Sequence, residues 1–387
     1  MAIEFLDLGS QPLANAFVTD VKKKEFRYDL KVQYDEDTHL VSLVEQPKKG
    51  LMFNDSYVYH SSGSRTMRDH FYEAALMIMK EWDPRHILEI GSNDGVFIQN
   101  FNAIFAECVE PCGNFAEHTQ KMGYKTHAEF WDMDMADNLA ERPDVIYSAN
   151  CMCHIPDLQE AFNAVYHALQ GGGIFVFEDP AITDILERNS YDQIYDEHAH
   201  LFSVTALRKM LWEAGLQLFD VQKLSVHGGS KRIFAKKSTT GIDLTQRAEY
   251  HLAYEKSLGI MDVETYHQFA RNVAQSKEDL TNLLKDELAD KKVICYGATS
   301  KSTTVFNHCD ITSSEIEYIV DTTPDKQGKW SPGVNIPVIS PEDGMNDTVD
   351  YAFLGAWNFV GEIKKNEAEF MERGGKFITH VPVVHVL

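Results

Sequence analysis

The stretch LEIGSNDGVF, residues 88–97, has the pattern of a strand end, a glycine turn and a helix start. The apolar run HILEIG, 86–91, has the length and composition of a buried strand. Gly91 and Gly95 permit backbone conformations that other residues rarely adopt, and they leave room for a ligand against the main chain. Their spacing differs from the GxGxxG fingerprint, which argues against a dinucleotide-binding sheet.

More apolar strands follow this turn, separated by helical segments: AECVEP (106–111), DVIYSAN (144–150) and GGGIFVFEDP (171–180). This alternation predicts a doubly wound parallel sheet. LQLFDVQKL and KRIFAKK, around 216–237 and joined by HGGS, predict an antiparallel pair. A second α/β block starts at 292 with KVICYGATSK and continues through EYIVDTTP, YAFLGAW and GKFITHVP.

The chain of 387 residues is too long for one ordinary core. Changes in texture place domain boundaries near 68 and 238. We therefore expect a small amino-terminal domain (1–68), a doubly wound domain (69–238), and a helical linker with a second α/β domain (239–387).

The composition is that of a soluble globular protein, with 44% hydrophobic and 25% charged residues. The formal charge of −23 repels phosphate backbones and anionic lipid, so we expect neither nucleic acid nor a membrane as partner. No secretory signal or membrane-spanning apolar run is apparent. Six cysteines without a CxxC pair indicate reduced thiols and a cytoplasmic location.

Ligands of open parallel sheets bind at the carboxyl ends of the strands. Glu110 ends the second strand, where a carboxylate can accept hydrogen bonds from two ribose hydroxyls. The loop residues Phe130 and Trp131 offer a ring for an adenine, or are simply core aromatics.

The glycine turn and the acidic residue together resemble the S-adenosylmethionine-binding sheet of class I methyltransferases. The alternative is another doubly wound fold, in which the acidic residue is only a cap. On this resemblance the candidate cofactor-binding residues are Glu89, Gly91, Asn93, Asp94, Gly95, Glu110, Pro111, Phe130, Asn150 and His154.

Cys151, Cys153 and His154 follow the strand at 144–150. Their spacing fits no common structural zinc site, and a strand would point them to alternating sides. We therefore expect no metal there and interpret the cysteines as small buried residues.

The stretch IYDEHAHLFS, 194–203, places Tyr195, Asp196, Glu197, His198 and His200 within six positions. Titratable groups at this density are costly to bury. The residues alone fit either the acid–base centre of an enzyme or a polar loop with capping carboxylates.

Seven motifs resemble those of the C-methyltransferases that act on nucleotide-linked 4-keto deoxysugars. They occur in order as YVYHSSGSRTMRDHF (57–71), EIGSNDG (89–95), HIPDL (154–158), YDEH (195–198), HGGS (227–230), GATSK (297–301) and AWNF (356–359). The resemblance extends from FLDLGSQPLAN near the start to AWNF. It implies a zinc-binding amino-terminal domain, a central methyltransferase domain and a carboxyl-terminal Rossmann-like domain, in agreement with the boundaries above.

The chain departs from this family at the zinc ligands. Relatives carry four cysteines there, one pair before FLDLG and one pair further on; this chain begins close to FLDLG, and Tyr34 and Asp37 stand at the second pair. We therefore expect no structural zinc.

The resemblance also implies roles in the acid–base stretch. A sugar carbon becomes nucleophilic once a base removes a proton beside the ketone and the enolate oxygen is stabilised. His198 is the expected base, Glu197 would orient the imidazole or bind the sugar, and Tyr195 would donate to the oxyanion. Asp196, where relatives often have histidine, receives no role, and His200 has equal chemical ability.

The hydroxyl-rich segment 57–64 suits sugar recognition, although it also fits a wet interdomain linker. Tyr57 is a candidate at the catalytic centre. Lys301, at a helix start, suits a nucleotide diphosphate; a nicotinamide site is the rival interpretation. The remaining candidate substrate residues are Tyr59, Ser62, Ser64, Glu178, His227, Arg232, Trp357 and Asn358, of which the HGGS residues also fit a β-turn and Trp357 also fits interdomain packing.

The sequence thus predicts a metal-free, S-adenosylmethionine-dependent C-methyltransferase of a nucleotide-diphosphate sugar, monomeric or a small homo-oligomer. The alternatives are O-methylation of a sugar, a catalytically idle nucleotide-sugar-binding protein and, more distantly, a nicotinamide oxidoreductase.

Overall fold

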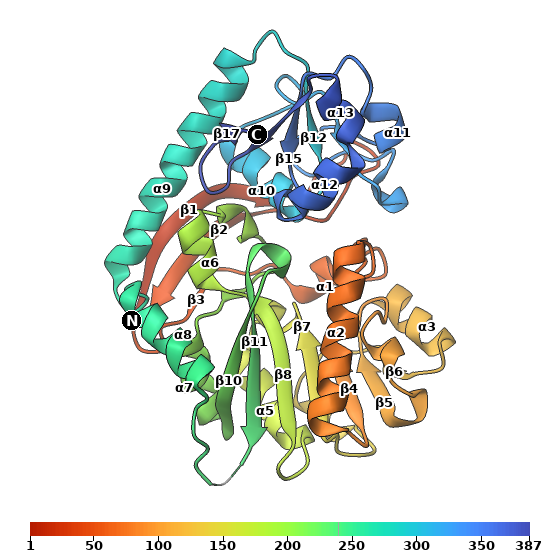
Figure 1. Ribbon diagram of the computed structural model, residues 1–387, viewed down its shortest axis with the longest axis vertical. Helices are drawn as coiled ribbons and strands as arrows, with labels where there is room; N and C mark the ends of the chain where they lie inside the picture. Colours follow the sequence, from red (N-terminus) through yellow and green to blue (C-terminus); the bar gives the residue numbers. More distant parts are fainter. Residues whose placement is uncertain (239) are drawn as a thin grey trace.

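The structure, a computed structural model, describes residues 1–238 and 240–387. Within these residues the strands form sheets of four, seven and six strands. Figure 1 shows the seven-stranded sheet at one end of the molecule and the six-stranded sheet at the other, with strands of the four-stranded sheet along one side between them. Thr239, at the expected boundary, lies outside the described residues.

The seven-stranded sheet confirms the predicted doubly wound fold and its antiparallel end pair. Its strands from β4 to β8 run parallel, and β11 is antiparallel to both of its neighbours. All four residues of β4 are buried, as expected for an apolar strand covered on both faces. The order is β10 (Leu216–Leu224), β11 (Ser230–Lys237), β8 (Ile174–Pro180), β7 (Val145–Ala149), β4 (Ile87–Ile90), β5 (Ala106–Val109) and β6 (Lys125–His127).

Helices cover both faces of this sheet. α2 (Arg65–Trp82) packs Phe71 and Ile78 against one face, and α5 (Leu158–Ala168) and α7 (Val204–Glu213) pack against the other. α2 begins at Ser64, whose hydroxyl accepts a hydrogen bond from the Met67 amide at 3.2 Å. The other helices of this region are α3 (Gly113–Lys121), α4 (Met133–Asp137) and α6 (Ile182–Arg188).

The strand order reverses between β4 and β7. The chain continues from β4 to β5 and β6 on one side, and from β7 to β8 on the other. The loops after β4 and β7 therefore diverge and leave a crevice at the carboxyl ends of the strands, which is where open α/β sheets bind ligands.

The four-stranded sheet joins the first residues to the acid–base stretch. Its order is β1 (Ala2–Pro12), β2 (Arg27–Asp35), β3 (Val41–Leu43) and β9 (His200–Leu201). β9 follows YDEH directly and pairs Leu201 with Val41 and His200 with Ser42. The sheet therefore includes residues from beyond position 68, and a short helix, α1 (Lys49–Met52), follows β3.

The charged segment after position 243 forms the expected helices, α8 (Gln246–Ser257) and α9 (Val263–Asn282). The six-stranded sheet after them is parallel except for its last strand. Its order is β14 (Val338–Ile339), β13 (Ile319–Val320), β12 (Val293–Tyr296), β15 (Tyr351–Leu354), β16 (Lys376–Thr379) and β17 (His385–Val386), with helices α10 (Ser300–Cys309), α11 (Pro341–Gly344), α12 (Val360–Asn366) and α13 (Ala368–Glu372).

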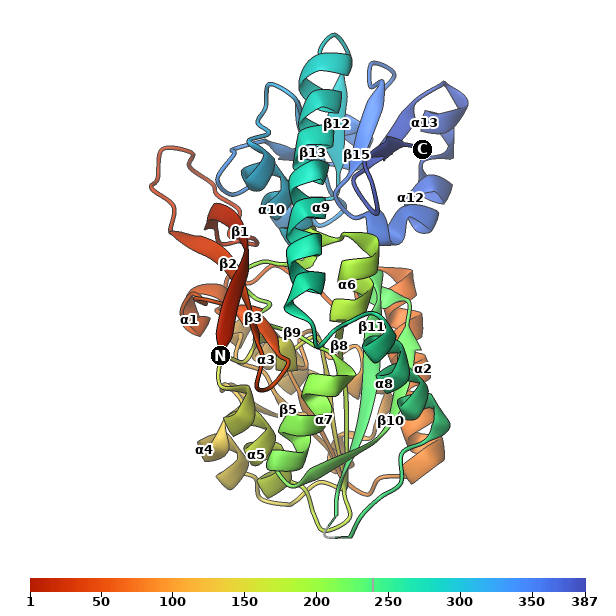
Figure 2. The same ribbon diagram turned by 90° about the vertical axis from the view of Figure 1, so that its left-hand side faces the viewer.

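α9 packs along the outside of the four-stranded sheet, as Figure 2 shows. Tyr266 of this helix is fully buried; its ring centroid lies 4.6 Å from that of Tyr34 and 5.1 Å from that of Phe5. Tyr34 stands at an expected cysteine position of the related zinc-binding domains. An aromatic cluster therefore occupies this part of the sheet. None of the helices in the described ranges combines the length and the apolar character needed to cross a bilayer.

We predict that Tyr266→Ala lowers the free energy of unfolding by about 3 to 5 kcal/mol, because it leaves a cavity between α9 and the sheet. Urea unfolding measures the change. Tyr250→Ala is the matched control, since Tyr250 lies on α8 and is 64% exposed. Equal losses for the two variants would contradict a stabilising role of the cluster.

Candidate active site

A cavity of about 210 Å³ lies at the carboxyl ends of the central strands. It brings together segments that are far apart in the sequence, from all three sheet regions. Of the predicted site residues it is lined by Tyr57, Tyr59, Gly91, Asn93, Glu110, Pro111, Phe130, Asn150, His154, Tyr195, Glu197, His198, His227, Lys301 and Asn358.

The glycine turn leaves no room for a side chain. Gly91 has φ +75°, and a Cβ there would lie 2.7 Å from the Cys151 sulfur. Position 91 therefore requires glycine both for its backbone conformation and for the close approach of the loop after β7.

Glu110, which follows β5, lines the cavity next to the glycine turn. The Asn93 amide donates to one oxygen of this carboxylate at 2.7 Å, and the Cys112 amide donates to the other at 2.9 Å. Burial raises the pKa of Glu110. Because the oxygens are held at the cavity wall, their remaining lone pairs can accept hydrogen bonds from a diol, as on a ribose.

The two aromatic residues of the 130–131 loop have different roles. Both residues line the cavity. Trp131 is also buried in the core, and its indole N–H donates to the Ala161 carbonyl at 3.1 Å. Phe130 is only partly buried, with the Lys49 ammonium 4.3 Å from its ring centroid, so it is the more accessible ring for a bound adenine.

Asp94 and Ser62 support the cavity without lining it. The Asp94 carboxylate accepts from the Ser62 amide at 3.0 Å and from the Ser62 hydroxyl at 2.7 Å. The Asn93 side chain likewise accepts from the Ser61 amide at 2.9 Å. These bonds attach the 57–64 segment to the glycine turn. Glu89 and Gly95 also lie outside the lining, and Ser64 caps α2 rather than facing a ligand.

The acid–base stretch is a buried turn and not a solvated loop, because every residue from 190 to 204 is buried. The Gln193 carbonyl lies 2.6 Å from His198 Nδ1, and the Tyr195 hydroxyl lies 2.8 Å from Nε2. A carbonyl can only accept, so Nδ1 carries the hydrogen and Nε2 presents its lone pair to the Tyr195 O–H. Burial, reinforced by His154, holds the pKa of His198 well below its usual range. The imidazole is therefore neutral.

Glu197 is held by the amino-terminal region. Its carboxylate accepts from the Asn15 side chain at 2.7 Å and from the Tyr57 hydroxyl at 2.8 Å. The bond that orients the His198 imidazole, expected from Glu197, is made instead by the Gln193 carbonyl. Burial raises the pKa of Glu197 and also that of Asp196, whose carboxylate accepts from the Ala14 amide at 2.9 Å.

The structure separates the two candidate histidines. His200 Nε2 lies 3.0 Å from the Ile155 carbonyl and 3.2 Å from the Pro156 carbonyl, and the ring is absent from the cavity lining. His198 lines the cavity. Of the two, only His198 can reach a ligand there.

Glu178 and Arg232, expected at the substrate, pair with each other in the interior. Arg232 Nε donates to the Glu178 carboxylate at 2.6 Å, and His70 lies 2.6 Å from its other oxygen. Burial alone would raise the pKa of Glu178, but Arg232 and His70 outweigh burial and lower it to about 2. Trp357 also faces away from the cavity: its N–H donates to Asp192 at 2.6 Å, and its ring packs on Gly228.

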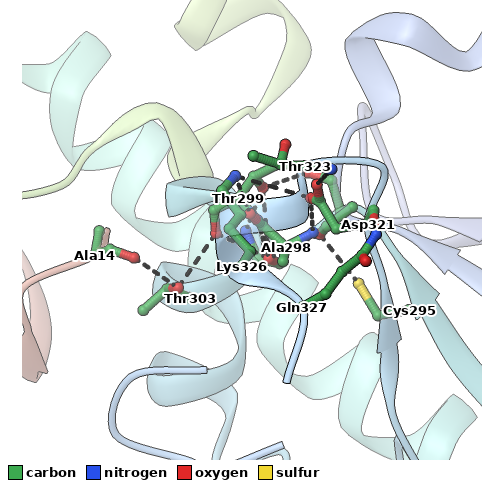
Figure 3. A network of polar contacts seen from close by, with 12 residues as sticks. Ala14, Cys295, Ala298, Thr299, Thr303, Asp321, Thr323, Lys326 and Gln327 are labelled. Atoms are coloured by element: carbon green, nitrogen blue, oxygen red, sulfur yellow. Dashed lines mark hydrogen bonds and ion pairs between the residues drawn. The ribbon is translucent and has the colours of Figure 1, made fainter. Parts of the chain in front are cut away.

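A network around Asp321 fixes the GATSK turn (Figure 3). The Ala298 amide donates to Asp321 at 2.7 Å, and the Lys326 ammonium donates to the Ala298 carbonyl at 2.7 Å. Lys301 and Lys326 both line the cavity. Lys326 and Gln193 were not predicted, because each lies in a segment without a recognisable motif. Asn15 was not predicted either, although it ends the stretch FLDLGSQPLAN.

A second cavity of about 350 Å³ adjoins the first, and Asn15, Tyr57 and Glu197 line both. Lys23, Lys24 and Lys329 add positive charge to the second cavity. The carboxylates of Asp20, Glu25, Asp196 and Glu197 line it as well, so the second cavity carries charges of both signs.

The cavity fits S-adenosylmethionine. Gly91 provides the close backbone approach, Glu110 provides acceptors for ribose hydroxyls, and Phe130 provides a ring near them. Gly91 follows β4, Glu110 follows β5 and Phe130 follows β6, so all three lie beyond the carboxyl ends of parallel strands.

Two family descriptions match most of the chain. Residues 65–221 match "Methyltransferase domain", and residues 225–382 match "C-methyltransferase C-terminal domain". The C-methyltransferase NovU of Streptomyces niveus is 30% identical over 396 residues, which covers 100% of this chain and 94% of NovU.

Solved structures with a similar fold cover less of the chain. An S-adenosylmethionine-dependent methyltransferase from Thermotoga maritima, described as a possible histamine N-methyltransferase, is 21% identical over 44% of this chain and 90% of its own, with a TM-score of 0.35. The CurJ carbon methyltransferase is 18% identical over 48% of this chain and 57% of its own, with a TM-score of 0.34.

We predict that Glu110→Gln weakens binding of S-adenosylhomocysteine at least about tenfold, because it removes the charge and one acceptor that ribose hydroxyls would use. Isothermal titration measures the affinity. Glu107→Gln on the same strand is the control, since Glu107 pairs with Lys125 and His127 outside the cavity. Equal affinity of the Glu110 variant and the unaltered protein would contradict this role.

Proposed function

This chain belongs to the C-methyltransferase family, and we propose that it transfers a methyl group from S-adenosylmethionine to a carbon of a nucleotide-linked 4-keto deoxysugar. The observation that carries the proposal is the neutral imidazole of His198 in the same cavity as the glycine turn and Glu110. A cofactor site and a base with an available lone pair are what carbon methylation beside a ketone requires.

S-adenosylmethionine supplies an electrophilic methyl group, so the chain must make a carbon nucleophilic and hold it in line. His198 Nε2 takes the proton from the carbon beside the ketone. The Gln193 carbonyl keeps Nδ1 protonated throughout, which fixes the reacting nitrogen as Nε2.

Tyr195 links the two halves of this step. Its hydroxyl donates to Nε2 in the ligand-free site. When the hydroxyl turns to the ketone oxygen, it frees the lone pair of His198 and supplies a donor to the developing enolate. Burial raises the pKa of Tyr195 well above its usual range, so the group stays a donor.

The sugar lies between the base and the amino-terminal segment in this proposal. Tyr57 and Tyr59 line the cavity, and Glu197 is held beside them by Asn15. Ring faces suit the apolar faces of a sugar, while the Glu197 carboxylate can accept from a sugar hydroxyl.

The diphosphate lies near Lys301 and Lys326, at the amino-terminal end of α10. This helix has ten residues and begins after Thr299, so its first amides and the two ammonium groups all favour an anion. Asn358 completes that wall.

Incubation with methyl-labelled S-adenosylmethionine and a panel of keto sugar nucleotides tests the proposal. We expect label on a ring carbon adjacent to the ketone, identified by NMR of the product. Label on oxygen would contradict carbon methylation, and binding of both ligands without any transfer would favour an idle binding protein.

We predict that His198→Gln lowers kcat at least about 100-fold, because general base catalysis is lost. His200→Gln is the matched control and should keep most of its activity, since His200 does not line the cavity. Exchange of the substrate's α-proton with deuterated water isolates the base step from methyl transfer. Unchanged exchange in the His198 variant would remove this residue from the mechanism.

We predict that Lys301→Gln raises KM for the sugar nucleotide about tenfold or more with a smaller change in kcat, because a charge-assisted contact to phosphate is lost. Lys285→Gln serves as control: its ammonium contacts the Asp310 carbonyl away from the cavity. A KM equal to that of the control would place the diphosphate elsewhere.

A further inference from the structure

Cys153, His154 and His198 form a compact group beside the reacting centre. Each offers one ligand atom, and the three atoms lie within 4.8 Å of one another. The expectation that a strand would separate residues 151–154 fails, because 152–154 form a 3₁₀ turn and His198 approaches from a different segment. The structure therefore assembles a ligand set that the sequence spacing does not reveal.

The donor set suits a soft divalent cation. One sulfur and two imidazole nitrogens are zinc ligands, and at usual bond lengths two of them lie about 3.5 Å apart on a tetrahedral ion. Small rotations of the side chains close the group to that size. His154 and His198 line the cavity, so a fourth position opens toward the substrate.

A second observation points to a ligand at this place. His154 Nε2 is buried and has no hydrogen-bond partner among the described residues. The two imidazoles are stacked, with centroids 5.4 Å apart and planes 19° from parallel. An unpartnered nitrogen at a cavity wall is costly in the free protein, and a cation removes that cost.

Asp179 stands behind the cysteine. One of its oxygens accepts from the Cys153 amide at 3.3 Å, and the other is buried without a partner in the described ranges. A carboxylate there is placed as an outer-shell group for a metal-bound thiolate, because it can take up or pass on the thiol proton.

We propose that Cys153, His154 and His198 bind one zinc ion, or a similarly thiophilic divalent cation, and that this ion inhibits the enzyme. Binding releases the thiol proton of Cys153 and involves no oxidation or reduction. His198 gives up its contact with either the Tyr195 hydroxyl or the Gln193 carbonyl to bind. The inhibition, unlike the binding, rests on the proposed function of His198 as base.

The binding test uses the full-length protein, treated with a chelator and reduced with a phosphine. Titration with cobalt or cadmium should produce a sulfur-to-metal charge-transfer band that saturates at one equivalent. Cys153→Ser should lose the band, while Cys309→Ser, which removes a buried cysteine elsewhere, should keep it. No band in the unaltered protein, or a band that survives in Cys153→Ser, would overturn the site.

The inhibition test compares the same variants in the methyl-transfer assay with added zinc. We expect Cys153→Ser to keep its turnover and to need at least about tenfold more zinc for half inhibition. Cys309→Ser should match the unaltered protein. A metal band at Cys153 without loss of turnover would overturn the participation of His198. Because the spectra require no substrate, failure of the sugar assignment would not be mistaken for failure of the metal site.

Discussion

The loop at Ala14 and Asn15 is the constraint on which the site depends. The Ala14 amide donates to Asp196, and its carbonyl accepts from the Thr303 hydroxyl of α10 at 3.0 Å (Figure 3). The Asn15 side chain holds Glu197. One short loop thus joins the acid–base turn, the first sheet and helix α10. Together with the bond from the Trp357 N–H to Asp192, it fixes the separation of the cofactor half and the lysine-lined half of the cavity.

The sequence was sufficient for the central sheet, because apolar runs, the glycine turn and Glu110 obey local rules. The residue type alone predicted less well which charged side chains face the cavity. Glu178 and Arg232 looked like ligand contacts, yet the antiparallel register pairs these two residues across β8 and β11. This pairing depends on the register between β8 and β11, which are far apart in the sequence. Gln193 contacts His198 through its backbone carbonyl, and Lys326 reaches the Ala298 carbonyl from another loop. Neither contact can be predicted from a local residue pattern.

The first sheet and the proposed metal site depend on different groups. Tyr34 of the first sheet packs on Tyr266 from α9. The proposed metal ligands, Cys153, His154 and His198, lie beside the reacting centre. Aromatic packing therefore stabilises the first sheet, whereas the Cys153 thiol and the imidazoles of His154 and His198 lie at or beside the cavity.

The helix α9 has a consequence for how the chain can vary in length. Its 20 residues span about 30 Å, and Tyr266 must face the first sheet while the far end leads into β12. Deleting a single residue would turn everything beyond it by about 100°. An insertion or deletion in α9 therefore keeps both the contact with the first sheet and the connection to β12 only if its length is close to a whole number of helical turns. The length of α9 thus fixes the distance between the two parts of the chain that would hold the ligands.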